Sequence, residues 1–318
     1  MSQIQEEAWK GGPLSITAFT PAYNRAHTLG RVWESLRSQT YRNFEWVIVD
    51  DGSVDDTRQV VEAYIKQADF PIRYFYQENN GKHMAFNRAV SEARGELFVV
   101  ADSDDTFVPE AFATLVRCWE EIPEDQRDAY RGITCRCYDP ETGRPIGEGA
   151  IPEPWVDCTE IEAVFLRRFR FEMWGMTRTE VLREFPFPNI PGGQKSGLKF
   201  FPEIIIYDRI AAKYRSRYIN QCLRGYYRDQ ANAATVKKGS RYKENYYLWA
   251  HYINDLFAYF RYDPKRFLKA FVGLVRDGKL SGRTMGTILQ DVHGAGRKLL
   301  VLLFSPVGLV LWMRGRRC

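Results

Sequence analysis

The chain has 318 residues, of which 45% are hydrophobic, so it can bury a sizeable core. This composition excludes a disordered or collagen-like chain. Because 45 basic and 40 acidic residues leave a net charge of only +5, no nucleic acid partner is expected.

Short apolar runs alternate with helical patterns over the first 110 residues. Each helix is indicated by apolar residues at helical spacing, and each strand by a continuous apolar run. Strands are predicted at residues 14–19, 44–49, 72–76 and 97–101, and helices after residue 25, at 58–65, after residue 81 and after Pro109. This order is typical of βαβ units with a parallel sheet that is covered on both faces.

The alternation ends near Thr134. Beyond it, we expect helices at residues 201–214, 242–261 and 264–275 and a strand at 223–228. Trp174 lies between strand-like residues, and it either stacks on an acceptor sugar or fills the core.

The six cysteines are scattered, and no CxxC pair occurs. Cys135 and Cys137 would share one face of a strand, with no histidine near them. We therefore expect buried free thiols rather than disulfides or zinc ligands.

Acidic residues directly follow two of the predicted strands. Asp50 and Asp51 end the second run, and the sequence DSDD at 102–105 follows the fourth. In an open α/β sheet, ligands bind beyond the carboxyl ends of the strands. Two acidic clusters repel each other there unless a cation lies between them, and divalent cations bring phosphates with them. A nucleotide diphosphate bound with a metal is the predicted ligand, and turn or helix-cap roles are the alternative.

Four motifs over the first 110 residues carry a family resemblance. They are TPAYNR at 20–25, VDDGSVDDT at 49–57, ENNGKHMAFNRAV at 78–90 and ARGELFVVADSDD at 93–105. In order and spacing they resemble family 2 glycosyltransferases. The resemblance implies a GT-A fold, which is a Rossmann-like, mostly parallel sheet flanked by helices. It also implies a nucleotide-sugar donor (most often a UDP-sugar), Mn²⁺ or Mg²⁺ at a D-x-D motif, and inversion at the anomeric carbon.

The same resemblance assigns roles to individual residues. The nucleotide would be lined by Pro21, Tyr23 and Arg25, and its base or ribose would be contacted by Asp51 or the neighbouring Asp50. The loop beside the nucleotide would contain Asn80 and Lys82. Asp102 would contact the ribose, and Asp104 would bind the metal. Asp105 receives no role.

An inverting transfer needs a base that takes a proton from the acceptor hydroxyl. The family places this base at the start of a helix in the second half, which here is the segment FPEIIIYDRI and makes Glu203 the candidate. Asp208 is the rival, and a first-turn acid that favours the helix dipole is the plain alternative for Glu203. Because five residues of helix turn through roughly 140°, both acids cannot face one site.

Three further features remain open in the sequence. His83 either reaches a phosphate or is a structural histidine. The loop at 189–199 either closes over the donor or is a plain surface loop. Arg228 is a candidate for neutralising the diphosphate.

We expect a polar N-terminal tail at 1–12 with no secretory signal, a catalytic domain at 13–235 and a helical region at 236–318. The catalytic domain would comprise a nucleotide-sugar half at 13–110 and an acceptor half at 111–235. Residues 299–313 are apolar with basic residues at both ends. With Pro306 in the middle they are too short to span a bilayer, so they favour an interfacial anchor over the alternative of packing on protein.

The sequence therefore predicts a metal-dependent glycosyltransferase, cytoplasmic and peripheral on the cytoplasmic face of the membrane. Its acceptor would be a saccharide or lipid-linked saccharide of cell-surface polysaccharide synthesis. A catalytically silent nucleotide-binding or scaffold protein is the alternative from another class. A sugar-nucleotide pyrophosphorylase is less favoured, because its Gly-rich N-terminal loop is missing.

Overall fold

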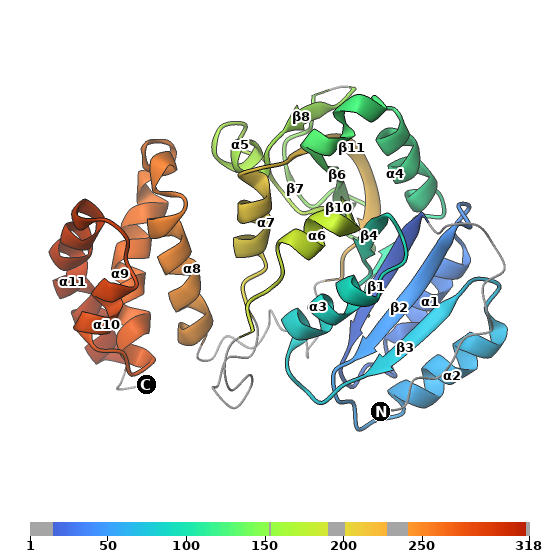
Figure 1. Cartoon of the computed structure of the whole chain (residues 1–318), viewed down its shortest axis with the longest axis horizontal. Coiled ribbons are helices and arrows are strands. Elements are labelled where there is room, and N and C mark those ends of the chain that lie inside the picture. The colour runs from blue at the N-terminus through green and yellow to red at the C-terminus, as the bar shows by residue number, and fades with distance from the viewer. Residues whose placement is uncertain (1–14, 153, 190–200, 228–240, 316–318) are drawn as a thin grey trace. The chain divides into compact units, whose positions relative to one another are not determined.

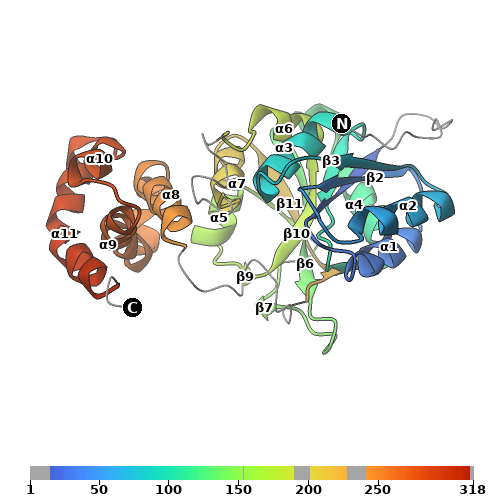
Figure 2. The same ribbon diagram turned by 90° about the horizontal axis from the view of Figure 1, so that it is seen from below.

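The computed structural model describes residues 15–152, 154–189, 201–227 and 241–315. The chain divides into two compact units, one of residues 1–191 with 206–230 and the other of 192–205 with 231–318. In Figures 1 and 2 the first unit has strands flanked by helices, whereas the described part of the second is helical. The predicted tail at 1–12, nearly all of the loop at 189–199, and Arg228 lie outside the described residues.

Four parallel strands form the first half of the sheet in the order β3-β2-β1-β4. They are β1 Ile16–Ala22, β2 Phe44–Asp50, β3 Ile72–Tyr76 and β4 Leu97–Val100. All of β2 is buried, as expected of a strand covered on both faces. The four predicted strands are confirmed. β1 continues beyond its predicted end because its last residues, up to Ala22, still pair with β2.

Helices cover both faces of this sheet (Figure 2). One face carries α1 Leu29–Arg37, α2 Thr57–Gln67 and α4 Ala111–Glu120, and the other carries α3 Lys82–Glu92 and α6 Thr179–Glu184. Leu29 and Phe112 share a core with Ile16 of β1. On the other face, the Phe86 ring of α3 lies edge-on to Phe19. The predicted α/β class with a mostly parallel sheet is confirmed.

The second half of the sheet continues from β4 in the order β10-β6-β11-β5. These strands are β10 Met173–Arg178, β6 Tyr130–Tyr138, β11 Arg215–Gly225 and β5 Thr106–Phe107. β10 is antiparallel to β4 and β6, while β11 runs parallel to β6. β11 begins eight residues before the predicted strand because its first half pairs with β6 and with β8 Val156–Cys158.

Shorter elements complete this unit. They are the 3₁₀ helix η1 Glu124–Ala129, the strand pair β7 Gly147–Glu148 and β9 Arg170–Phe171, α5 Glu160–Phe165, and α7 Ile204–Ala211, whose first two residues belong to the second unit. The helix predicted at 201–214 is thus present but shorter.

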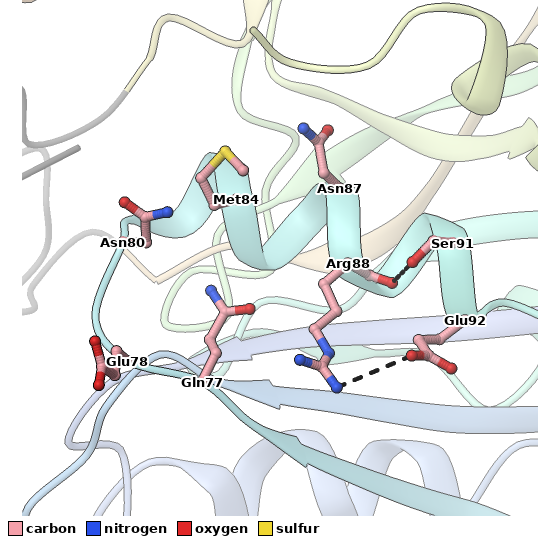
Figure 3. Close-up of a pocket in the computed structure, with 8 residues that line it drawn as sticks. All are labelled: Gln77, Glu78, Asn80, Met84, Asn87, Arg88, Ser91 and Glu92. Carbon is pink, nitrogen blue, oxygen red and sulfur yellow. Dashed lines mark hydrogen bonds and ion pairs between the residues drawn. The ribbon is translucent and has the colours of Figure 1, made fainter. Parts of the chain in front are cut away.

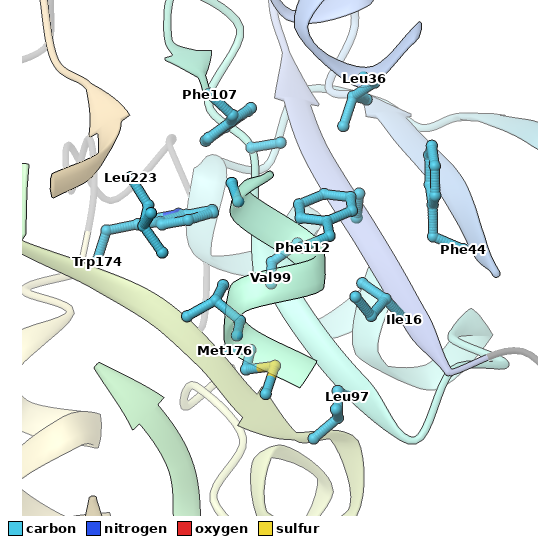
Figure 4. Packing of buried hydrophobic residues seen from close by; sticks show 14 of the residues in the cluster. Ile16, Leu36, Phe44, Leu97, Val99, Phe107, Phe112, Trp174, Met176 and Leu223 are labelled. Carbon is cyan, nitrogen blue, oxygen red and sulfur yellow. The ribbon is translucent and has the colours of Figure 1, made fainter. Parts of the chain in front are cut away.

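Trp174 belongs to the hydrophobic core of the first unit (Figure 4). Its ring stacks on Phe107 with centroids 4.8 Å apart, and its Nε1 donates a hydrogen bond to the Val100 carbonyl at 2.7 Å. Of the two roles considered for Trp174, the core role is the one that the structure supports. Cys135 and Cys137 are buried and free, as predicted.

Besides residues 201–205, the second unit contains α8 Tyr242–Asn254, η3 Phe257–Tyr262, α9 Pro264–Leu280, α10 Met285–Gln290 and α11 Ala295–Gly315. The prediction of one helix over 242–261 was wrong. α8 ends where Asp255 donates its backbone N–H to the His251 carbonyl and pairs through its carboxylate with His251 Nδ1. The chain then buries Leu256 and continues as a 3₁₀ turn.

α11 runs for 21 residues without interruption, with Pro306 inside it. Proline has no N–H, which leaves the Leu302 carbonyl without its usual helical donor. The Ser305 hydroxyl donates to that carbonyl at 2.8 Å. On the inner side of α11, a Cβ at Gly308 would lie only 2.8 Å from Val275 Cβ, so glycine allows α9 to approach closely.

Candidate active site at the carboxyl edge of the sheet

Asp51 follows β2 directly and ties down the loop after β3. Its Oδ1 accepts hydrogen bonds from the Asn80 backbone N–H at 2.9 Å and from Gln77 Nε2 at 2.8 Å, and its Oδ2 accepts from the Gly81 N–H at 2.7 Å. Gly81 has φ +94°, a conformation that favours glycine. Burial raises the pKa of Asp51, although these three donors oppose the rise. Asp51 thereby sets the start of α3, where Lys82 lies.

Asp50 is committed to its own turn. Its Oδ1 accepts from the Ser53 N–H at 2.7 Å, and its Oδ2 accepts from the Tyr74 hydroxyl at 2.6 Å. Asn24, in the left-handed conformation with φ +53°, joins the loop after β1 to the same turn, because its N–H donates to Ser53 Oγ at 2.8 Å. The loops after β1, β2 and β3 are therefore one hydrogen-bonded assembly.

The predicted nucleotide-wall residues lie at the end of β1. Pro21 is within β1, beyond the predicted end of this strand, and pairs in register with Val49. Tyr23 is 49% exposed just beyond the strand. Arg25 is half-buried, and its charge acts to lower the pKa of both Asp102 and Asp104, although burial raises that of Asp104 overall. All three residues thus lie at the edge that carries the acidic clusters.

Asp102 lies between two cations. Lys82 Nζ is 2.9 Å from its Oδ1, and Arg224 Nη2 is 3.3 Å from its Oδ2. Burial acts to raise the pKa of Asp102, but Lys82 and Arg224 outweigh it, so the pKa is lowered. The carboxylate is therefore held ionised by groups of the protein itself.

The two other acids of the DSDD segment differ from Asp102. Burial and the charge of Asp102 raise the pKa of Asp104, whose carboxylate makes no ion pair with any residue that the structure describes. Asp105 is almost fully buried, and Arg224 Nη2 lies 2.6 Å from its Oδ2. Burial raises the pKa of Asp105 to about 8 against the opposing effect of Arg224. Asp104 is thus the acid of this segment that is left to interact with a ligand.

Arg224 and Gln77 are the site residues that sequence reasoning missed. Arg224 reaches Asp102 from β11, 122 residues later in the chain, and the local sequence LRGYY gives no signal for it. Gln77 follows β3 directly, so its place at the end of a strand was a signal that could have identified it.

Asp208 lies at the other end of the sheet. On α7 its charge raises the pKa of Glu160, a buried acid whose Oε2 accepts a hydrogen bond from Arg131 at 3.1 Å. Arg131 also donates to Thr177, which pairs with Phe98 near the start of β4, whereas Asp102 follows the end of β4. Asp208 therefore belongs to a buried ionic cluster remote from the DSDD segment. Glu203 immediately precedes α7 in the chain.

His83 lies on the buried side of α3, where burial lowers its pKa and its ring lies edge-on to Phe187. These contacts fit the structural role of His83.

A pocket of about 600 Å³ lies on the outer side of α3 (Figure 3). Its lining residues are Gln77, Glu78, Asn80, Met84, Asn87, Arg88, Ser91 and Glu92. Gln77 and Asn80 are shared with the loop that Asp51 holds. Of the residues predicted for the site, Asn80 alone lines this pocket. The pocket therefore lies next to the predicted active site and does not contain it.

Residues 17–140 match the family model of Glycosyl transferase family 2. Glycosyltransferase GlyG of Streptococcus pneumoniae is 34% identical over 118 residues, which are 37% of this chain and 38% of that protein. An uncharacterized glycosyltransferase of Nostoc, alr2836, is 35% identical over 107 residues, 34% of this chain and 33% of that one. The match thus spans about a third of the length of these relatives.

Solved structures resemble the chain over nearly all of its length. Residues 1–349 of TarS from S. aureus, crystallised in complex with UDP-GlcNAc, align with a TM-score of 0.60 at 15% identity, over 96% of this chain and 92% of that one. At this identity the likeness concerns the fold, and it confirms the predicted GT-A class. The family-model match of residues 17–140 and the likeness in fold both agree with the resemblance to family 2 glycosyltransferases.

Proposed function

We propose that the protein is an inverting, metal-dependent glycosyltransferase that moves a sugar from a UDP-sugar to a saccharide or lipid-linked saccharide acceptor in cell-surface polysaccharide synthesis. The observation that carries the proposal is the placement of Asp51 and the DSDD segment at the carboxyl ends of β2 and β4, on either side of β1. Strand order reverses between β1 and β4, which is where open α/β sheets bind ligands. The complex of TarS with UDP-GlcNAc supports a UDP-sugar as the donor.

The acids of the DSDD segment fit a divalent cation. No group of three or more metal-ligating side chains occurs among the described residues, so the protein alone does not build a complete cage. Mg²⁺ and Mn²⁺ accept such sites, because they use one or two carboxylates and complete their shell with water and substrate phosphates. Asp104 would hold the ion, and Asp102 would contact the ribose. When bound, the ion would stabilise negative charge on the departing diphosphate.

The remaining side chains bind and orient the donor. Lys82 and Arg224 keep Asp102 ionised before the donor arrives, and their positive charge favours the diphosphate. Asp51 orders the loop from Gln77 to Gly81, so that Asn80 and Lys82 are in place beside the nucleotide. Tyr23 offers an exposed ring on which a base can stack.

Glu203 is our proposed general base, which accepts the proton of the attacking acceptor hydroxyl. The surroundings of Asp208 support this choice, because that buried acid lies near the Glu160–Arg131 pair and away from the DSDD segment. We also propose that the enzyme is cytoplasmic and works at the membrane surface, within reach of a lipid-linked acceptor.

The test combines binding and turnover. UDP and GDP are compared by thermal shift with and without Mn²⁺, and hydrolysis of UDP-sugars is followed over time. We expect UDP to stabilise the protein only with Mn²⁺, and Asp104→Asn to abolish hydrolysis while the fold survives. Asp125→Asn, at an exposed acid of η1, is the matched control.

Full activity of Asp104→Asn in the presence of EDTA would refute the metal site. UDP binding with no hydrolysis and no transfer to any acceptor would support the silent nucleotide-binding protein instead.

A further inference from the structure

The outward side of α11 is a continuous apolar stripe. Its large exposed side chains recur every three or four residues, which places them on one face of the helix. They are Leu299, Leu302, Leu303, Val307, Val310 and Met313. The stripe is roughly 20 Å long at the helical rise of 1.5 Å per residue. No described residue covers it, and a stripe of this size marks a surface that meets a partner.

The inner side of α11 is fixed on α9. Val301 is fully buried, the Phe304 ring stacks on Phe271 with centroids 5.9 Å apart, and Gly308 lies against Val275. α9 carries six ionisable side chains in 17 residues, namely Lys265, Arg266, Lys269, Arg276, Asp277 and Lys279. By length and apolarity α11 alone could cross a bilayer. Crossing while packed on α9 would take the charges of α9 into hydrocarbon, which is costly. α11 is therefore suited to lie along a surface.

The charges at the ends of α11 select among possible occupants. Residues 294–318 contain Arg297, Lys298, Arg314, Arg316 and Arg317 and no acidic residue. A second copy of α11 would bring basic ends together in either a parallel or an antiparallel pair. An anionic lipid surface instead offers hydrocarbon to the stripe and negative headgroups to both ends.

We infer that the outward face of α11 is a membrane-docking surface, which lies in the plane of an anionic bilayer without crossing it. The inference rests on the proposed membrane location but not on the proposed chemistry, because binding to vesicles is measured without donor or acceptor.

The experiment is co-sedimentation of the full-length protein with phosphatidylcholine vesicles that contain 0 or 30% phosphatidylglycerol, at low and high salt. We expect binding to the anionic vesicles that high salt weakens only in part, since the apolar contact persists. The double variant Leu299→Gln with Leu303→Gln should bind roughly 100-fold more weakly, because each buried leucine contributes on the order of a factor of ten. Both leucines are 67% exposed, so the variant should fold.

The matched control is Leu166→Gln with Leu268→Gln, at exposed leucines outside α11, and it should bind like the parent chain. Donor hydrolysis in solution should be unchanged in both variants. If the parent protein hydrolyses no donor, the proposed chemistry is refuted, but the docking inference is not.

Three results would overturn the docking inference. One is equal vesicle binding by the two double variants. Another is that the parent protein does not bind vesicles and is a dimer in sedimentation equilibrium, whereas the α11 variant is a monomer. The third is resistance of the membrane-bound protein to alkaline carbonate extraction, which would show that α11 crosses the bilayer.

Discussion

Arg224 is 7% exposed, and its guanidinium contacts both Asp102 and Asp105, two acids of one segment. Breaking a buried ion pair by removing one partner leaves an uncompensated charge, which typically destabilises a protein by about 3–5 kcal/mol. This cation thus acts on both the stability of the site and its geometry.

We predict that Arg224→Met lowers the melting temperature and weakens the affinity for UDP with Mn²⁺ by tenfold or more. Arg224→Lys should recover part of the stability, because it restores the charge without the planar fork. Differential scanning calorimetry and titration calorimetry measure the two effects. Arg215→Met, at the exposed start of the same strand, should change neither. Unchanged UDP affinity in Arg224→Met would show that Arg224 has no part in the binding site.

Asp51 gives a second prediction at this scale. In Asp51→Asn the new amide group would face backbone N–H donors that now point at a carboxylate, so at least one of them would lose its acceptor. We expect faster hydrogen exchange at Asn80 and Gly81 and weaker UDP binding. A variant that releases the loop but binds UDP normally would assign Asp51 a purely structural role.

The two candidate bases at α7, Glu203 and Asp208, have different surroundings. Asp208 is buried beside Glu160, and the Tyr207 ring before it lies 5.4 Å from the Arg131 guanidinium. Tyr207 thus packs on the Arg131 guanidinium, so α7 has a structural role whether or not catalysis uses an acid on it.

We predict that Glu203→Gln lowers transfer by about 100-fold or more, the usual effect of losing a general base, and leaves UDP binding intact. Asp208→Asn should lower thermal stability with much less effect on turnover per folded molecule. Steady-state kinetics combined with thermal melts separate the two outcomes. A larger loss of turnover in Asp208→Asn would transfer the base role to Asp208.

Gly308 tests the packing of α11 on α9. A methyl group there meets Val275 and the Val272 carbonyl, so Gly308→Ala should destabilise the helical unit by roughly 1–3 kcal/mol. Gly296→Ala, with open space around it on the same helix, should be neutral or stabilising by roughly up to 1 kcal/mol. Urea unfolding followed by circular dichroism measures both. Equal effects would mean that the close approach at Gly308 contributes nothing.

At the scale of the molecule, each unit has a hydrophobic core of its own. We therefore predict that UDP with Mn²⁺ slows hydrogen exchange in residues 50–82 and 102–105, whereas anionic vesicles slow it in residues 297–313. Each ligand should leave the other region unchanged. Protection of residues 50–82 by vesicles would show that the two surfaces are coupled.

The sequence predicted what depends on neighbours along the chain and missed what depends on distant ones. β2 was predictable because it is buried on both faces, so its apolar run is unbroken. Asp51 and Asp102 were predictable because each directly follows such a run. Arg224 and Trp174 were not assigned, because their partners lie 122 and 74 residues away and nothing local marks them. The break after α8 was missed because Tyr and Phe continue at helical spacing through η3.

The hydrogen bond donated by the Ser305 hydroxyl matters more in a membrane than in water. In solution any carbonyl freed by a proline is hydrated, so the bond from Ser305 to the Leu302 carbonyl adds little there. Hydrocarbon contains no hydrogen-bond donors, so a carbonyl without a donor from the protein is strongly destabilising there. Because α11 supplies its own donor beside Pro306, the Leu302 carbonyl is hydrogen-bonded in hydrocarbon as well as in water. A helix equipped in this way can exchange one solvent for the other without refolding.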